Sequence, residues 1–174
     1  DRAAELLKAA GVTSALLNLG SSTIRAIGSK PDGSPWRIAL QDPNDTSAYA
    51  GVVSATDLSI DTSGGYERYF EGDDGEIYWH ILDPGTGYPA KNGLISVTVL
   101  SGSALTGDGL STALFVMGLS DAIDYWRENG GFEFIFITDQ NESWYIENCS
   151  GTQYAAIRLN DDLLFLEPNM AVIG

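Results

Sequence analysis

The sequence predicts an α+β fold with a largely antiparallel sheet and grouped helices. Short segments of strand character, bounded by turns, come in runs, and the helix signals cluster instead of alternating with strands. The 174 residues are 44% hydrophobic, which is enough for one core and too little for two. We therefore expect residues 1–174 to form a single domain.

The chain opens with an amphipathic helix. Ala3, Leu6, Leu7 and Ala10 recur at helical spacing, and Gly11 follows where a glycine is favoured after a helix. Because no Met or cap precedes this helix, we interpret the chain as a fragment of a longer protein. The strands expected next are residues 12–20, their hairpin partner 22–28, then 36–40 and 50–61.

The middle of the chain predicts a hairpin, a loop and a strand. Strand segments around 66–70 and 77–82 flank a turn at 71–76 that contains an Asp-Gly pair. A loop rich in Gly and Pro covers 83–93, and 94–100 is β-branched.

Two helices and a meander complete the prediction. We expect one helix at 108–118 and a second from an N-cap at Ser120 to about Glu128. The last predicted strands are 132–138, 143–148, 154–159 and 163–167.

Composition excludes several classes of protein. The net charge of −15 disfavours nucleic acid and anionic membranes as partners, and favours a free nucleotide only when a metal ion screens its phosphates. Cys149 is the only cysteine, which excludes a disulfide framework and a Cys-rich zinc site. The sequence has neither a signal peptide nor an apolar run long enough to span a membrane.

The segment 105–118 offers oxygen ligands at helical spacing. Asp108 and Thr112 are four residues apart, so a helix that starts near Asp108 places both side chains on one face. Carboxylate and hydroxyl oxygens suit a hard cation such as Mg²⁺, and a helix N-terminus favours a phosphate. The alternative is structural, with Asp108 as the helix cap and Thr112 packed in the first turn.

His80 is the only histidine, and it precedes a rigid turn. It suits a general base or a phosphate contact, although it could equally be a half-buried strand residue. In the turn, Asp83-Pro84 is an ordinary turn starter, and Gly85 and Gly87 would let backbone amides approach a ligand.

The segment 61–69 combines small hydroxyls and glycines with tyrosines. Such residues could line a pocket for a flat ring. The alternative is a β-bulge with exposed aromatic side chains.

These segments resemble the ApbE family of FAD:protein FMN transferases in order and spacing. The matching motifs are Ser63-Gly-Gly-Tyr-Glu-Arg-Tyr69, His80-Ile-Leu-Asp-Pro-Gly-Thr-Gly-Tyr-Pro89 and Asp108-Gly-Leu-Ser-Thr-Ala113. The resemblance covers roughly residues 1–128 and implies the T-fold-like architecture of that family. Ser21, Gly65 and Gly109 depart from the family pattern, each by a small residue.

The resemblance implies a set of site residues. Asp108 and Thr112 would bind Mg²⁺ with help from Ser111, and His80 would activate the acceptor hydroxyl. The residues expected against the flavin nucleotide are Leu82, Asp83, Thr86, Gly87 and Ser63.

The same resemblance implies a substrate, a partner and a place in the cell. FAD would be the substrate and Mg²⁺ the cofactor, and a Thr or Ser of a flavoprotein subunit would accept the FMN. The chain itself has no Ser/Thr-Gly-Ala-Thr segment like that of such acceptors. The parent protein would be extracytoplasmic and lipid-anchored.

Two further functions stay open at this point. One is an FAD-binding scaffold without turnover, and the other is a Mg²⁺-dependent FAD pyrophosphatase in which water replaces the acceptor. Because the family places an FAD-contacting Asp and another metal ligand before the position of Asp1, we expect the isolated chain to be inactive.

Overall fold

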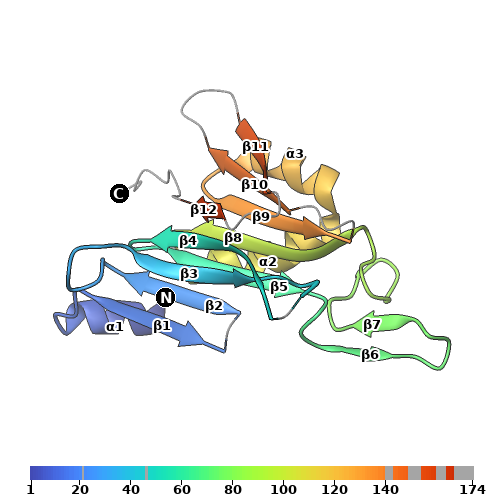
Figure 1. Cartoon of the computed structure of the whole chain (residues 1–174), viewed down its shortest axis with the longest axis horizontal. Coiled ribbons are helices and arrows are strands. Elements are labelled where there is room, and N and C mark those ends of the chain that lie inside the picture. The colour runs from blue at the N-terminus through green and yellow to red at the C-terminus, as the bar shows by residue number, and fades with distance from the viewer. Residues whose placement is uncertain (21, 46, 140–142, 149–153, 160–163, 167–174) are drawn as a thin grey trace.

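The main sheet of the protein has seven strands, as shown by a computed structural model. The model describes residues 1–20, 22–45 and 47–139 in full, and the backbone of 143–148, 154–159 and 164–166. Every neighbouring pair of strands in the main sheet is antiparallel, which confirms the predicted fold class. In spatial order the strands are β1 (Ala15–Leu19), β2 (Thr23–Ile27), β5 (Ser59–Gly64), β8 (Leu94–Ser101), β9 (Glu133–Thr138), β10 (Ser143–Asn148) and β11 (Tyr154–Leu159) (Figure 1).

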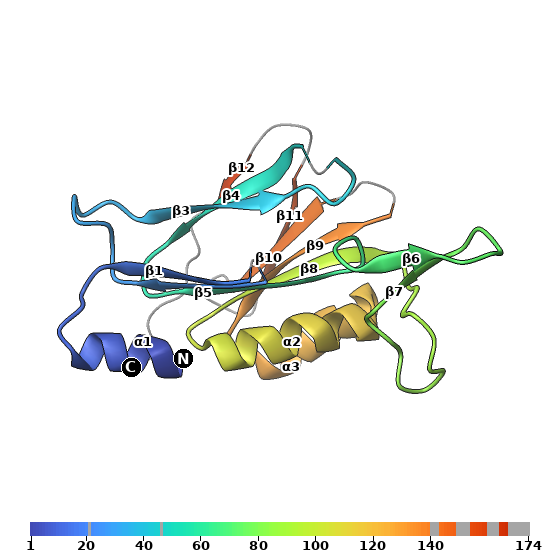
Figure 2. The same cartoon turned by 90° about the horizontal axis from the view of Figure 1, so that it is seen from below.

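A smaller sheet covers one face of the main sheet. Its strands are β12 (Leu164–Leu166), β4 (Tyr49–Ala55) and β3 (Trp36–Gln41), with β4 and β12 parallel. The helices α1 (Arg2–Ala9), α2 (Ala104–Met117) and α3 (Leu119–Asn129) lie on the opposite face (Figure 2). No helix of the described residues is long and apolar enough to cross a membrane.

Side-chain alternation along the strands builds a core on each face of the main sheet. Phe134 and Phe136 of β9 pack in the cluster beneath α2 and α3, whereas Ile135 packs in the cluster beneath β3 and β4. Successive residues of a strand point to opposite faces, so an apolar run such as β9 serves both cores.

The predicted strand 50–61 is wrong, because the structure divides it between β4 and β5 in two different sheets. The break lies at Asp57, whose φ of 50° is the only positive value of a residue other than glycine in the described chain. The Asp57 carboxylate accepts a hydrogen bond from the Gly28 amide (3.1 Å) and pairs with Lys8 (2.7 Å). Lys8 and Gly28 thus stabilise the bend at Asp57, and because both are distant in sequence, the apolar pattern of residues 50–61 does not predict it.

Helix α2 begins four residues before the predicted start near Asp108. Ser103 is its N-cap and accepts a hydrogen bond from the Thr106 amide at 3.2 Å. The Asp1 carboxylate accepts from the amides of Ala104 and Leu105 at 2.9 Å each. The helix N-terminus therefore already has an anionic partner, and the structure gives no reason to place a phosphate there.

The boundary between α2 and α3 also differs from the prediction. Gly118, with φ of 80°, precedes α3 as its N-cap, so Ser120 lies within the helix and does not cap it. The Asn92 side-chain amide donates to the carbonyls of Phe115 (2.7 Å) and Val116 (3.2 Å), where α2 ends. A glycine and a distant amide thus make the break.

The predicted hairpin around 71–76 is confirmed, with shorter strands. β6 (Tyr69–Glu71) and β7 (Ile77–Trp79) pair antiparallel and form a separate two-stranded sheet. We call residues 69–79 the arm, because they project from the end of the main sheet (Figure 2). β7 ends at Trp79 since the chain then turns, and Leu82 forms a bridge with Pro89.

Candidate functional site

Three predicted site residues meet where β5 packs on α2. The Ser63 Oγ atom lies 2.9 Å from Ser111 Oγ and 2.9 Å from Thr112 Oγ1. Ser59, Asp61 and Ser63 share the face of β5 that looks toward α2, because strand side chains alternate. Ser111 is buried and Thr112 is exposed, so the hydroxyl cluster runs from the interior to the surface.

Asp108 lies one helical turn before Thr112, and both are exposed. Its carbonyl accepts a hydrogen bond from Ser111 Oγ at 3.1 Å, and Thr112 Oγ1 lies 3.5 Å from the same carbonyl. Ser103 caps the helix, so the alternative that Asp108 is the cap is wrong. The Asp108 side chain is therefore exposed on the helix surface, one turn before Thr112 of the hydroxyl cluster.

Asp61 is fully buried beneath the turn of α2 that contains Asp108, and it was not among the predicted site residues. Its Oδ2 accepts from Ser59 Oγ at 2.7 Å, whereas Oδ1 has no hydrogen-bond partner among the described residues. A Cβ atom added to Gly107 would lie 2.0 Å from Oδ2, so helix and carboxylate are in direct contact. An acidic residue at an inward position of a strand was the signal that could have identified it.

Burial is the main reason that the pKa of Asp61 rises to about 6. Hydrogen bonds from the hydroxyls of Ser59 and Thr23 oppose this rise in pKa, the negative charge of Asp108 adds to it, and Arg25 lowers it again. The carboxylates of Asp61 and Asp108 thus repel each other, and a cation would relieve this repulsion.

His80 lies directly after β7, and its side chain is exposed, so the alternative of a half-buried strand residue is wrong. Its backbone amide donates to the Arg68 carbonyl at 3.2 Å, and Nδ1 lies 3.3 Å from the same oxygen. A proton on Nδ1 directed at this carbonyl leaves Nε2 as the nitrogen that can accept a proton.

The turn after His80 is held by its own backbone and by Asp83. The Asp83 Oδ1 atom accepts from the Gly85 amide (2.8 Å), and its carbonyl accepts from the amides of Gly87 (2.8 Å) and Thr86 (3.2 Å). Gly87 has a φ of 74°, which favours glycine. Leu82 is 51% exposed at the start of this turn, and contact of these residues with a flavin stays a prediction.

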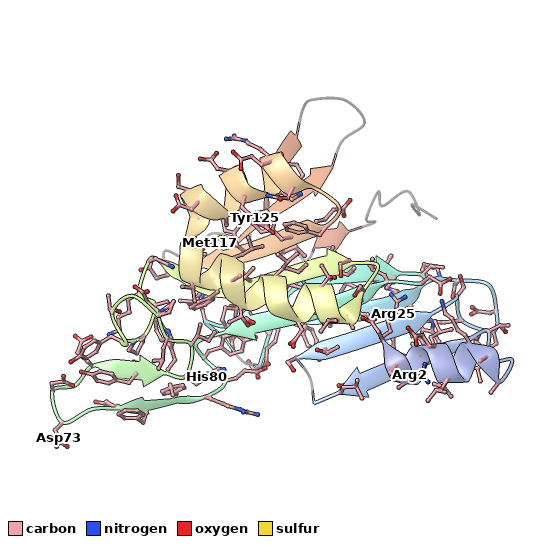
Figure 3. All side chains as sticks on the ribbon, turned by 180° about the vertical axis from the view of Figure 1, so that it is seen from behind. Arg2, Arg25, Asp73, His80, Met117 and Tyr125 are labelled. Atoms are coloured by element: carbon pink, nitrogen blue, oxygen red, sulfur yellow. The ribbon has the colours of Figure 1, made fainter. Side chains whose placement is uncertain are left out.

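Trp79 connects the arm to the hydroxyl cluster. Its ring meets Phe115 of α2 edge to face, with centroids 6.2 Å apart. A Cβ added to Gly65, two residues after Ser63, would lie 2.8 Å from the same ring. His80 therefore follows a residue packed between α2 and the end of β5, at the base of the arm (Figure 3).

A cavity of about 490 Å³ lies on the other face of the main sheet. Its lining includes Thr62 and Thr98, whose hydroxyls are 2.9 Å apart, together with Ile60, Tyr49 and Tyr66. Thr62, Tyr66 and Glu67 of the segment 61–69 line it, whereas none of the residues expected to bind the metal or the flavin nucleotide does, nor does His80. Its size therefore says nothing about the chemistry at Asp108 and His80.

The oxygen atoms near Asp108 suit Mg²⁺ by their chemistry. The Asp108 carboxylate and the cluster of Ser63, Ser111 and Thr112 supply only oxygen, and the unpartnered Asp61 Oδ1 is a buried acceptor nearby. Within the described ranges, no three His, Cys, Asp or Glu residues gather as a metal cluster. Mg²⁺ commonly keeps several waters and needs few protein ligands, so these residues fit the ion.

The raised pKa of Asp61 predicts how stability depends on pH. The folded protein keeps the proton of Asp61 to about pH 6, while the unfolded chain releases it near pH 4. The free energy of unfolding should therefore fall as pH rises from about 4 to about 6, by roughly 2 to 3 kcal/mol. Urea unfolding of the protein and Asp61→Asn at several pH values measures this, and the variant should lack this part of the slope.

Asp57→Asn is the matched control. A hydrogen bond from Lys8 is the main reason that the pKa of Asp57 is lowered. Asp57 therefore adds stability above its unfolded pKa that is lost as pH falls, which is the opposite sign. Equal pH slopes for the protein and Asp61→Asn would contradict the prediction.

The sequence of the chain is similar to the ApbE family and to proteins that are named as flavin transferases. A model described as the ApbE family matches residues 1–136, and one described as Peptidase family C69 matches 116–174, less than half of the chain. The FAD:protein FMN transferase of Vibrio cholerae is 44% identical over 119 residues, covering 68% of this chain and 35% of the relative. That of Haemophilus influenzae is 36% identical over 143 residues, covering 81% and 41%.

Solved structures give the same result. The ApbE protein of Thermotoga maritima matches with a TM-score of 0.74 and 35% identity, over 82% of this chain and 46% of that one. The flavin transferase ApbE from Vibrio cholerae matches with a TM-score of 0.69 and 31% identity, over 92% and 47%. The chain spans less than half the length of each of these proteins.

Proposed function

Because the chain belongs to the ApbE family, we propose that it carries the cation site and the base for Mg²⁺-dependent transfer of FMN from FAD to a Thr or Ser of an acceptor flavoprotein. The single observation that carries this proposal is the hydroxyl cluster of Ser63, Ser111 and Thr112 beside Asp108. The cluster brings oxygen atoms that can bind a metal from β5 and from α2 to one point of the surface.

In the proposed reaction, the acceptor oxygen attacks the phosphorus atom on the flavin side of the FAD pyrophosphate. The bond from that phosphorus to the bridging oxygen breaks, and AMP leaves. The proton of the acceptor hydroxyl passes to Nε2 of His80, whose Nδ1 faces the Arg68 carbonyl. Mg²⁺, when bound, neutralises charge on the phosphates.

The acidic composition supports a role for a cation. The net charge of −15 opposes a ligand whose pyrophosphate is dianionic, and Asp61 and Asp108 add local repulsion. A divalent ion between the carboxylate of Asp108 and the phosphates would reverse this repulsion. The hydroxyls of the cluster would then orient the ion or its waters without adding negative charge.

His80→Gln is expected to lower FMN transfer about 100-fold or more, because it removes the proton acceptor and keeps the size and neutrality of the ring. FAD binding should change little, since the His80 side chain is exposed and its only hydrogen-bond partner among the described residues is the Arg68 carbonyl. The measurement uses the natural protein that contains this chain, with FAD, Mg²⁺ and a peptide containing Ser-Gly-Ala-Thr. Mass spectrometry detects the gain of FMN, and fluorescence titration follows FAD.

Asp121→Asn on α3 is the control, because it removes an exposed carboxylate away from the site. Equal transfer by the protein and His80→Gln would remove His80 from the base role. The same assay separates the alternative functions. Release of FMN and AMP without peptide labelling indicates a pyrophosphatase, and FAD binding without cleavage indicates a scaffold.

We also propose that the parent protein is extracytoplasmic and lipid-anchored. The family resemblance supports this, and fractionation of cells that produce the natural protein tests it.

A further inference from the structure

The arm carries aromatic side chains that face solvent. Tyr69 is 58% exposed and Phe70 is 65% exposed. Phe70 stacks on Tyr78, its cross-strand partner, with centroids 5.3 Å apart and planes at 11°. Exposed aromatic rings on a projecting element are typical of an interaction surface and not of a core.

The arm is also acidic. Residues 69–79 contain four carboxylates and no lysine or arginine. Two of the carboxylates have partners, since Asp74 Oδ2 accepts from the Tyr78 hydroxyl (2.7 Å) and Glu76 pairs with Lys91. Glu71 and Asp73 are left at the tip, and Figure 3 shows Asp73 farthest from the body.

The arm already binds one cation of its own chain. The Lys91 ammonium lies 5.6 Å from the centroid of Tyr78 and 6.0 Å from that of Trp79. The same ammonium pairs with Glu76. This side of the arm thus combines an aromatic face with a carboxylate, the two groups that attract a lysine or arginine side chain.

The arm leads directly to His80. The hydrogen bond from the His80 amide to the Arg68 carbonyl continues the ladder of β6 and β7 past Trp79. Both outer edges of this two-stranded sheet lack a strand partner among the described residues. A segment in extended conformation that lies along the arm would therefore end at the histidine, which stands at the base of the arm (Figure 3).

We propose that the arm binds the acceptor polypeptide. The acceptor carries basic side chains on both sides of its Thr or Ser, and the acidic arm holds the acceptor by these side chains. This inference rests on the proposed function, because it assigns His80 to the end of the bound segment. The aromatic rings contact the aliphatic and cationic parts of the peptide, and Glu71 and Asp73 attract its charge. The acidity of the arm disfavours an anionic membrane as its partner.

The test measures binding of two fluorescent peptides to the 174-residue chain by anisotropy, without FAD. Both contain Ser-Gly-Ala-Thr, flanked by lysines in one and by glutamates in the other. We expect the lysine peptide to bind at least about tenfold more tightly. Phe70→Ala should weaken its binding about tenfold, and Glu71→Lys with Asp73→Lys should reverse the preference. Tyr49→Ala is the control, because Tyr49 is an aromatic residue of β4 that is 62% exposed.

Equal binding of the two peptides, or arm variants that bind as the unchanged protein does, would overturn the proposal. Thermal melting of each variant shows that the fold is retained. The same variant also tests two other partners that could bind the arm, a membrane and a second copy of the chain. Binding to lipid vesicles that Phe70→Ala abolishes would assign the arm to a membrane, and dimerisation that Phe70→Ala abolishes would assign it to a second copy. Peptide binding by the chain, together with no flavin transfer by the natural protein in the presence of FAD and Mg²⁺, would count against the proposed function alone.

Discussion

Asp108→Asn is expected to weaken Mg²⁺ binding and FMN transfer by about 100-fold or more. The amide keeps the shape of the side chain and removes the exposed carboxylate that lies one helical turn before Thr112. Loss of residues that merely orient a metal ligand commonly costs 10- to 100-fold in affinity, so loss of the ligand itself should cost at least as much. Calorimetric titration of Mg²⁺ measures binding, and the peptide mass assay measures transfer.

Asp121→Asn is again the matched control, because it removes the same charge from α3. Equal Mg²⁺ affinity in the protein and Asp108→Asn would exclude Asp108 as a ligand. A loss of transfer with unchanged Mg²⁺ affinity would instead place the carboxylate on the substrate.

Gly107→Ala is expected to lower the free energy of unfolding by about 2 to 3 kcal/mol, the upper part of the range of roughly 1 to 3 kcal/mol found for overpacked interiors. The added Cβ would lie 2.0 Å from Asp61 Oδ2 and 2.7 Å from its Cγ, so the helix or the strand must move. Asp61 is 0% exposed, so any movement of its carboxylate must displace neighbouring side chains or the strand. Urea unfolding at neutral pH measures the effect.

Gly109→Ala is a control in the same helix. A Cβ at this position meets nothing within 4 Å, so this change should stabilise the protein by about 0.5 to 1 kcal/mol. The clash also predicts that Asp61→Ala restores part of the stability of Gly107→Ala, because the two sites are coupled. Equal effects of the two glycine substitutions would show that α2 does not press on Asp61.

Local patterns predicted most of the elements, and the errors lie at the boundaries between elements. The strands β8 and β9 were predicted because β-branched and aromatic runs are local signals. The bend at Asp57 was missed because its partners, Lys8 and Gly28, lie far away in sequence. The start of α2 was placed too late although its N-cap, Ser103, is a local signal. The Asp1 carboxylate, which also accepts from the first amides of α2, is about a hundred residues away and could not be read from the local pattern.

The residues of the candidate site were likewise predicted only in part. The resemblance implied Ser63 as a flavin contact and Thr112 as a metal ligand, and their proximity was not predicted, whereas the structure places their hydroxyls 2.9 Å apart. Asp61 was missed because the burial of a carboxylate depends on which helix covers its strand. Cys149, which the sequence assigns to no site, lies outside the described residues.

Asp1 accepts hydrogen bonds at the first turns of two helices, α1 and α2, and this links their local opening. Its carbonyl accepts from the Glu5 amide at 3.0 Å within α1, and its carboxylate accepts from the first amides of α2. When α1 frays, the amides of Ala104 and Leu105 lose their acceptor and become free to exchange with solvent. Hydrogen exchange at the first turn of α2 therefore reports the opening of α1, and the stability of α1 sets how long the helix that carries Asp108 keeps its first turn intact.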